Sequence, residues 1–197
     1  MSEKKLILAS TSPRRKELLI SAGYKIEIVS NPNIDEAVTK KVGAIAKAIY
    51  LAKKKAFATK ALISEEKLKN SNGIIAADTL IFYKNHIIGK PKTKEEAKTI
   101  LTLLSGKRHK VVTGCCYICP SGRCFTKHCV SLVYFRKLSE ADIDKTLSFS
   151  EWQDAAGAYK IQEHGVALVR KIKGSLTNII GLPIEEVVAI LSKKCNK

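Results

Sequence analysis

The stretch KLILA at residues 5–9 constrains the fold more than any other part of the sequence. After Lys5 it is an unbroken apolar run, which is typical of a strand covered on both faces within a parallel sheet. Directly after it, Ser12 offers a helix N-cap, Pro13 stands at the first helical position, and Gly23 closes the helix. A buried strand followed at once by a helix predicts an α/β protein.

The rest of the chain alternates between strand-like and helix-like segments. It contains no internal repeat, low-complexity tract or clear linker. We therefore expect a central mixed sheet flanked by helices, in a single domain over residues 1–197. Strands are expected at 24–30, 74–83, 86–90, 111–119 and 125–135, glycine-punctuated strands at 155–175, and helices at 42–62, 93–106, 140–148 and 183–194.

The chain is strongly basic. Lysine and arginine number 35 against 18 acidic residues, for a net charge of +17. Such a charge favours anionic partners: nucleic acid, an acidic membrane surface or phosphorylated small molecules. The lysines are scattered from Lys4 to Lys197, without a zinc finger or RNP motif, and aromatic residues make up only 6%. A dedicated nucleic-acid-binding protein is thus a disfavoured alternative, and solvation of the surface explains much of the charge.

The apolar runs and the cysteines indicate the compartment. No run reaches the 18 apolar residues of a membrane span, and the start MSEKKLILAS lacks a signal-peptide core, so we expect a cytoplasmic protein without a membrane partner. Cys116 and Cys119 form a CxxC pair beside Cys115, but Cys124 and Cys129 do not form a second pair at zinc-ribbon spacing. Buried thiols in a hairpin are the favoured interpretation, and a metal or redox site is the alternative.

The start of the first helix carries an unusual amount of positive charge. Arg14 and Arg15 stand where the helix dipole is already positive, which is unfavourable unless an anion binds there. Free backbone N–H groups, the hydroxyls of Ser10 and Ser12, and guanidinium groups could together cradle a phosphate. The alternative is a surface helix whose arginines face water, and this stretch alone does not decide between them. It is not a P-loop, because the glycines and the GK[ST] ending are missing.

Two acidic and two basic residues elsewhere add to this pattern. Asp78 lies within the apolar stretch IIAADTLIF, where a carboxylate is costly unless a cation or hydrogen bonds compensate it. Glu36 follows the turn-forming NPN, Lys55 ends a triple-lysine run, and Lys90 lies in the tight GKP segment. Separated carboxylates with several cations would suit a magnesium–phosphate site. Each residue by itself also has a structural explanation, as an exposed lysine or a turn acid.

Taken together, the motifs resemble those of one family, the Maf nucleoside triphosphate pyrophosphatases, also called septum formation proteins. The resemblance spans nearly the whole chain, and its specificity comes from the order of eight motifs. These are LASTSPRRKELL, NIDE, LAKKKA, AADT, IIGKP, LSGKRHKVVTG, AGAYKIQEHG and GSLTNIIGLPIEEV.

The resemblance implies a mixed sheet with a deep cleft between two lobes, similar to inosine triphosphate pyrophosphatases. It also implies hydrolysis of a nucleoside triphosphate to the monophosphate and pyrophosphate with a divalent cation, Mg²⁺ or Mn²⁺, and a homodimer as a common assembly. The family's functional positions fall on Ser10, Arg14, Arg15, Glu36, Lys55, Asp78, Lys90 and Gln162, each with the expected residue type.

These residue types suit the implied reaction. Arginines and lysines (Arg14, Arg15, Lys55 and Lys90) neutralise phosphate oxygens and the leaving pyrophosphate. Glu36 and Asp78 are the expected metal ligands, and Asp78 is the favoured base because its strand fixes its direction. Ser10, Ser12, Thr79 and Gln162 suit substrate positioning better than proton transfer.

The motifs also bear on the choice of nucleotide. AADT and AYKIQ resemble the branch of the family acting on dTTP and UTP, whereas the branch preferring 7-methyl-GTP typically carries SDQ. The segment SFSEWQDAAGAY departs from the family's usual proline-containing stretch, and Trp152 within it could stack on a larger base. The alternatives are a pyrophosphatase for 7-methyl-GTP or another nucleotide, a non-catalytic nucleotide-binding regulator, and a basic nucleic-acid-binding protein.

Overall fold

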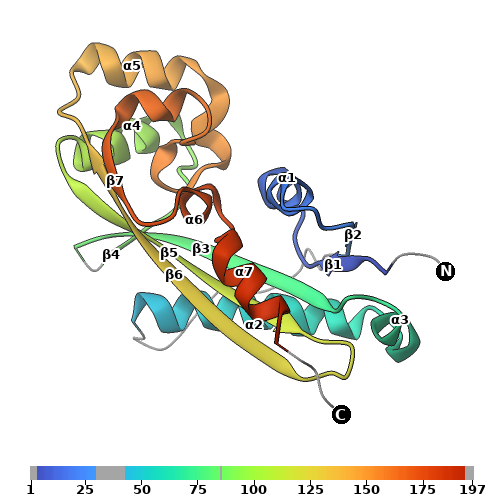
Figure 1. Ribbon diagram of the computed structural model, residues 1–197. Helices are drawn as coiled ribbons and strands as arrows, with labels where there is room; N and C mark the ends of the chain where they lie inside the picture. The colour runs from blue at the N-terminus through green and yellow to red at the C-terminus, as the bar shows by residue number, and fades with distance from the viewer. Residues whose placement is uncertain (1–3, 30–42, 85, 194–197) are drawn as a thin grey trace. The chain divides into compact units, whose positions relative to one another are not determined.

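The structure, a computed structural model, describes residues 4–29, 43–84 and 86–193 (Figure 1). Glu36, which follows the NPN stretch in the sequence, lies outside these residues. The strands are β1 (Leu6–Leu8), β2 (Ile26–Ile28), β3 (Ile74–Tyr83), β4 (His86–Ile88), β5 (Arg108–Ile118), β6 (Cys124–Phe135) and β7 (Val169–Lys173). The helices are α1 (Pro13–Ser21), α2 (Ala44–Ala61), α3 (Glu65–Lys69), α4 (Lys94–Leu104), α5 (Glu140–Ser148), α6 (Leu176–Ile180) and α7 (Ile184–Leu191), with 3₁₀ turns η1 (Ser150–Asp154), η2 (Ala156–Ala158) and η3 (His164–Leu168).

The strands pair in the order β2-β1-β3-β5-β6-β7, with β4 also paired to β3. β1 is parallel to both β2 and β3, whereas β3–β4 and β6–β7 are antiparallel. The expected mixed sheet is therefore confirmed, as is the helical character of the segments that flank its strands. In the described part of the chain, no helix is long and apolar enough to cross a membrane.

The chain divides into two compact units, and β3, β5 and β6 each run through both. Unit 1 comprises Met1–Thr79, Thr113–Cys129 and Gly181–Lys197, and unit 2 comprises Leu80–Val112 and Val130–Ile180.

Unit 1 has a buried cluster on each face of its strands, because successive side chains of a strand point to opposite faces. One cluster packs against α2 and the other against α1 and α7. The α2 face contains Ile7, Ala9, Ala52, Ala56, Ile74, Ala76, Cys116 and Ile118, and the α1 face contains Leu6, Leu8, Leu19, Ile75, Ala77, Cys115, Tyr117, Leu182 and Val187.

A glycine lets α2 approach the strands closely. A Cβ added at Gly114 in β5 would lie 2.4 Å from the backbone carbonyl carbon of Ala48 in α2, well inside contact distance. Glycine is thus required at this position by the packing of the helix rather than by a turn. The close approach fixes the position of β5 relative to α2.

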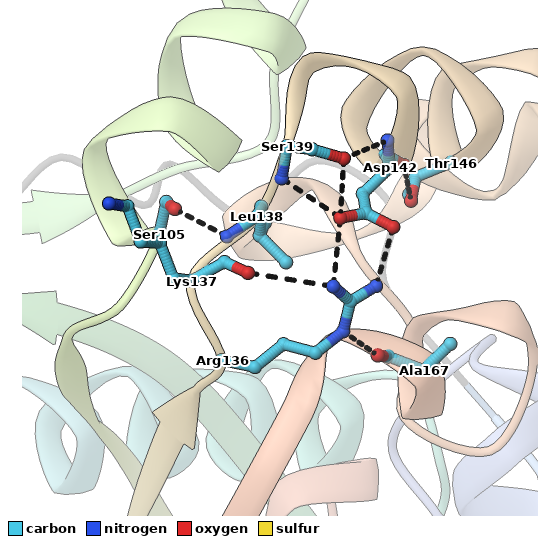
Figure 2. Close-up of polar contacts among 8 residues, drawn as sticks. All are labelled: Ser105, Arg136, Lys137, Leu138, Ser139, Asp142, Thr146 and Ala167. Carbon is cyan, nitrogen blue, oxygen red and sulfur yellow. Dashed lines mark hydrogen bonds and ion pairs between the residues drawn. The ribbon is translucent and has the colours of Figure 1, made fainter.

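Unit 2 has a core of its own, to which α4 and α5 contribute Leu101, Leu104, Ile143 and Leu147. A capping box begins α5, in which Ser139 and Asp142 exchange hydrogen bonds (Figure 2). Arg136 adds a bidentate ion pair to Asp142, with N–O distances of 2.7 and 2.8 Å, and its Nε donates to the carbonyl of Ala167 (Figure 2). The Arg136 guanidinium and the Ser139 amide hold the pKa of the Asp142 carboxyl below its usual range.

The segment 155–175 corrects the sequence-based prediction. Instead of several strands it forms η2, η3 and then the single strand β7. Gly157 and Ala158 both adopt positive φ, at 76° and 62°, which turns the backbone out of an extended path. Other local predictions are confirmed: Pro13 begins α1, and the β3–β4 hairpin pairs Tyr83 with His86.

Candidate active site

The candidate site lies at the carboxyl end of β1, where the neighbouring strand β3 extends beyond it. Just past the end of β1, the Ala9 amide donates to the Ile75 carbonyl of the parallel strand β3 at 2.9 Å. Asp78 and Thr79 follow in β3, past the end of β1. Ligands in sheets of this kind bind beyond the carboxyl ends of parallel strands, so this is where a site is expected.

Asp78 is held by Lys55 on the α2 face of β3. Lys55 Nζ donates to Asp78 Oδ1 at 2.5 Å, and only 18% and 7% of the two side chains are exposed. Lys55 lies one turn after Ala52, on the side of α2 that packs against the strands. The ammonium explains how a carboxylate is tolerated inside an apolar strand, as the sequence required.

Arg15 is held by three groups on the other face, where α1 packs. Its Nε donates to the Gly181 carbonyl at 2.9 Å, its Nη1 to Ser10 Oγ at 3.2 Å, and its Nη2 to Thr79 Oγ1 at 3.3 Å. Thr79 Oγ1 also donates to the Gly181 carbonyl at 3.1 Å and lies 2.9 Å from Thr113 Oγ1. The guanidinium is thus fixed in orientation by segments far apart in the sequence.

The start of α1 retains donors that these contacts do not use. Ser10 Oγ accepts from the Ser12 amide and from Arg15, both at 3.2 Å, which leaves its own O–H able to donate. Ser12 occupies the N-cap of α1, but its side chain makes no capping hydrogen bond. Arg14 is half-buried and has no hydrogen bond or ion pair with other described residues. An anion could bind to these groups and to the N-terminal amides of α1.

Unit 2 carries two further predicted residues. Lys90 Nζ lies 2.6 Å from Asp154 Oδ1, and 60% and 68% of the two side chains are exposed. The Gly157 amide donates to the Gly89 carbonyl at 3.1 Å, which ties the GKP segment to the AGAY segment. Gln162 is exposed in the same segment, just after the buried Ile161. The convergence of these residues with those of unit 1, and with Glu36, stays a prediction.

A comparison with known protein families shows to which family this chain belongs. The sequence model for the family described as Maf-like protein matches residues 5–194. The chain belongs to the Maf-like family.

Individual relatives support the membership of this protein in the Maf-like family. It is 42% identical to a dTTP/UTP pyrophosphatase of Treponema denticola, over 96% of this chain and 97% of the relative. It is also 42% identical to a dTTP/UTP pyrophosphatase of Pyrococcus furiosus, over 95% and 94% of the two chains. Among solved structures, a HAM1 protein from Coxiella burnetii shares the fold, with a TM-score of 0.50 and 14% identity over 98% of this chain and 100% of that one.

The predicted site residues account for most of the contacts described above but not for all of them. Thr113 and the Gly181 carbonyl of unit 1 and Asp154 of unit 2 were not predicted. Thr113 lies within the quoted motif LSGKRHKVVTG, so the sequence offered a signal, although nothing local connects it with Thr79. A backbone carbonyl such as that of Gly181 has no signal of its own in the sequence.

Trp152 and the buried cysteines pack within the cores of the described units. Trp152 is partly buried and packs against the unit 2 core. Burial raises the pKa of the Cys115 thiol to about 12 and also raises that of Cys116, which makes these thiols poor nucleophiles. The described cysteines form no disulfide with one another, and no cluster of three potential metal ligands occurs in the described part of the chain. The interpretation as small apolar side chains is confirmed for the buried thiols.

Proposed function

We propose that this Maf-like protein hydrolyses dTTP and UTP to dTMP or UMP and pyrophosphate. The observation that carries the proposal is the Lys55–Asp78 pair, which directly precedes in β3 the threonine that Arg15 of α1 contacts, in a chain that is 42% identical to dTTP/UTP pyrophosphatases over almost its full length. A fixed carboxylate that acts together with cationic side chains suits attack by water on a phosphoric anhydride. A covalent nucleophile is not required.

The cations bind the triphosphate in this proposal. Arg14, with no partner among the described residues, and Arg15, held in a fixed orientation, suit phosphate oxygens, which accept bidentate hydrogen bonds from guanidinium groups. Ser10 O–H and the N-terminal amides of α1 add neutral donors. Lys55 and Lys90 stabilise the charge that develops on the leaving pyrophosphate.

Asp78 acts as the general base. Its carboxylate takes the proton of the attacking water, and the new bond from oxygen to the α-phosphorus forms as the bond to the pyrophosphate oxygen breaks. Lys55 orients the carboxylate through its hydrogen bond to Oδ1. The product pyrophosphate leaves intact because the cations bind it as one unit.

A divalent cation, Mg²⁺ or Mn²⁺, completes the proposal. The hard carboxylate oxygens of Asp78 fit such an ion, which prefers one or two carboxylates together with substrate phosphate oxygens. Asp78 and Glu36 would hold it, and it would supply charge neutralisation of the phosphates. Asp78 is the one proposed metal ligand among the described residues. It is sufficient for the proposal, because the phosphate oxygens of the substrate would provide further ligands.

Thr79 and Gln162 position the substrate, and the selectivity for dTTP and UTP follows from the AADT and AYKIQ motifs and from the relatives. A 7-methyl-GTP pyrophosphatase, a non-catalytic regulator and a nucleic-acid-binding protein are not favoured by those relatives. A cytoplasmic location and a homodimer belong to the proposal as well, on the sequence and on the family resemblance.

Product analysis tests the proposal. The protein is incubated with dTTP and Mg²⁺, and the products are separated by ion-exchange chromatography. We expect dTMP and pyrophosphate in equal amounts, and a parallel incubation with EDTA should abolish turnover. Release of dTDP and inorganic phosphate would contradict the proposed bond cleavage, and unchanged dTTP would contradict the enzymatic function itself.

A further inference from the structure

Thr113 contacts the group that holds Arg15, although neither the motifs nor the relatives assign it a role. It is fully buried in β5, and its Oγ1 lies 2.9 Å from Thr79 Oγ1. The next residue, Gly114, faces α2, so strand alternation directs Thr113 to the face where α1 packs. The close approach of Gly114 to α2 also fixes the position of the strand that carries Thr113.

The hydrogen bonds of Thr79 have defined directions. The Gly181 carbonyl can only accept, so the Thr79 O–H donates to it, and Arg15 Nη2 donates to Thr79 Oγ1. The Thr79 and Thr113 hydroxyls share a further hydrogen bond, in which Thr113 donates whenever the single Thr79 proton is given to Gly181. These three contacts use the full hydrogen-bonding capacity of the Thr79 hydroxyl, which is one donor and two lone pairs.

This arrangement makes the orientation of Thr79 depend on Thr113. A threonine hydroxyl can occupy several staggered χ1 positions, and the position seen here satisfies Arg15, Gly181 and Thr113 together. Without the Thr113 hydroxyl, one lone pair of Thr79 would be left unsatisfied in a largely buried place. Other orientations of Thr79 would then compete, and Arg15 would lose a fixed acceptor.

We propose that Thr113 is a positioning residue for substrate binding, acting through Thr79 on Arg15. The inference rests on the proposed function, in which Arg15 binds the triphosphate. Loss of the Thr113 hydroxyl should weaken substrate binding with little effect on the chemical step, because Asp78 and Lys55 lie on the opposite face of β3. A lost hydrogen bond of about 1 kcal/mol corresponds to a rise of roughly fivefold in KM for dTTP.

Two matched substitutions separate this role from simple packing. Thr113→Val keeps the volume and removes the hydroxyl, whereas Thr113→Ser keeps the hydroxyl and removes a methyl group. We expect Thr113→Val to raise KM about fivefold with kcat within about twofold of the parent, and Thr113→Ser to behave like the parent. Packing alone predicts the reverse order, with the serine variant more impaired.

Two further comparisons keep the test decisive. If Thr113→Val does not fold, the pair Thr113→Ala and Thr113→Ser differs only by the hydroxyl, and the alanine variant alone should show the raised KM. In a Thr79→Val background, Thr113→Val should have little additional effect on KM, because the hydroxyl it acts on is already absent.

The possible results test the role of Thr113 separately from the proposed hydrolysis of dTTP. A parent protein that does not hydrolyse dTTP would overturn the proposed function. An active parent with equal KM values in the parent, valine and serine variants would overturn the role of Thr113. Additive effects of Thr79→Val and Thr113→Val would overturn the relay through Thr79.

Discussion

Asp78 and Thr79 are neighbours in β3, yet their side chains make contacts on opposite faces of the strand. Asp78 accepts from Lys55 of α2, and Thr79 accepts from Arg15 of α1. The alternation of side chains along a strand makes this separation unavoidable for adjacent residues. The carboxylate proposed for proton transfer is thereby separated from the group that orients a substrate-binding arginine, so substitutions on the two faces should affect different kinetic constants.

Asp78→Asn should remove turnover while leaving nucleotide binding largely intact. The amide keeps the size of the carboxyl and still accepts from Lys55, but it does not act as a base. Loss of general-base catalysis lowers kcat by about 10²- to 10⁴-fold. Single-turnover kinetics with dTTP and calorimetric titration with a non-hydrolysable analogue measure the two properties. A kcat within about threefold of the parent would exclude Asp78 as the base.

The two predicted site lysines should differ in their effect on stability. Lys55→Met leaves the 7% exposed Asp78 carboxylate without its ammonium, which is expected to cost about 3 kcal/mol of unfolding free energy. Lys90→Met removes a highly exposed pair with Asp154 and should change stability by less than about 1 kcal/mol. Both should reduce activity, and Lys53→Met, at an exposed position of α2, is the control. Equal urea midpoints for the Lys55 and Lys90 variants would contradict the importance of the Lys55–Asp78 pair.

The adjacent arginines provide a second matched comparison. Arg15→Lys cannot reproduce the contacts to Ser10, Thr79 and Gly181, so it should lower both the melting temperature and the affinity for dTTP. Arg14→Lys should lower only the affinity, because the half-buried Arg14 makes no such contacts within the described residues. Melting curves with and without nucleotide distinguish the two. An unchanged melting temperature for Arg15→Lys would show that the contacts to Ser10, Thr79 and Gly181 do not stabilise the fold.

His109 should make the stability of unit 2 depend on pH. Burial lowers the pKa of this histidine to about 4, from 6.5 in the unfolded chain, and its Nε2 lies 2.8 Å from the Tyr159 hydroxyl. As the pH falls from 6.5 to 4, the unfolded state takes up a proton that the folded state does not, so the free energy of unfolding falls by about 3 kcal/mol.

Urea unfolding at several pH values between 4 and 7 measures this loss, with His109→Gln as the comparison. The variant should show a smaller decrease in unfolding free energy over that range, because it lacks the titrating ring. Identical pH dependence in the parent and the variant would show that other groups cause the decrease.

The sequence was sufficient to predict those helices and strands that are marked by residues close together in the chain. The apolar run that became β1, the proline that begins α1 and the alternation of strands with helices all depend on residues close together in the chain. The same holds for the candidate carboxylate of Asp78, because a charge inside an apolar strand stands out without any knowledge of the fold.

Contacts between distant segments could not be predicted in this way. Arg15 at a helix start was expected to face an anion, yet it also donates to a carbonyl 166 residues away. The hydroxyl contact between Thr79 and Thr113 joins two strands and has no periodicity to reveal it. Similarly, the positive φ of Ala158 turns a segment that otherwise has the composition of strands.

The selectivity of hydrolysis tests the central claim most directly. Triphosphate contacts are the same for every nucleotide, so discrimination must come from groups that meet the base. The measurement is kcat/KM for dTTP, UTP, ATP, GTP and 7-methyl-GTP under one metal condition, with Asp78→Asn as the blank. We predict values for dTTP and UTP that exceed those for the purine nucleotides by about tenfold or more. A higher kcat/KM for any purine nucleotide would contradict the assignment to dTTP and UTP.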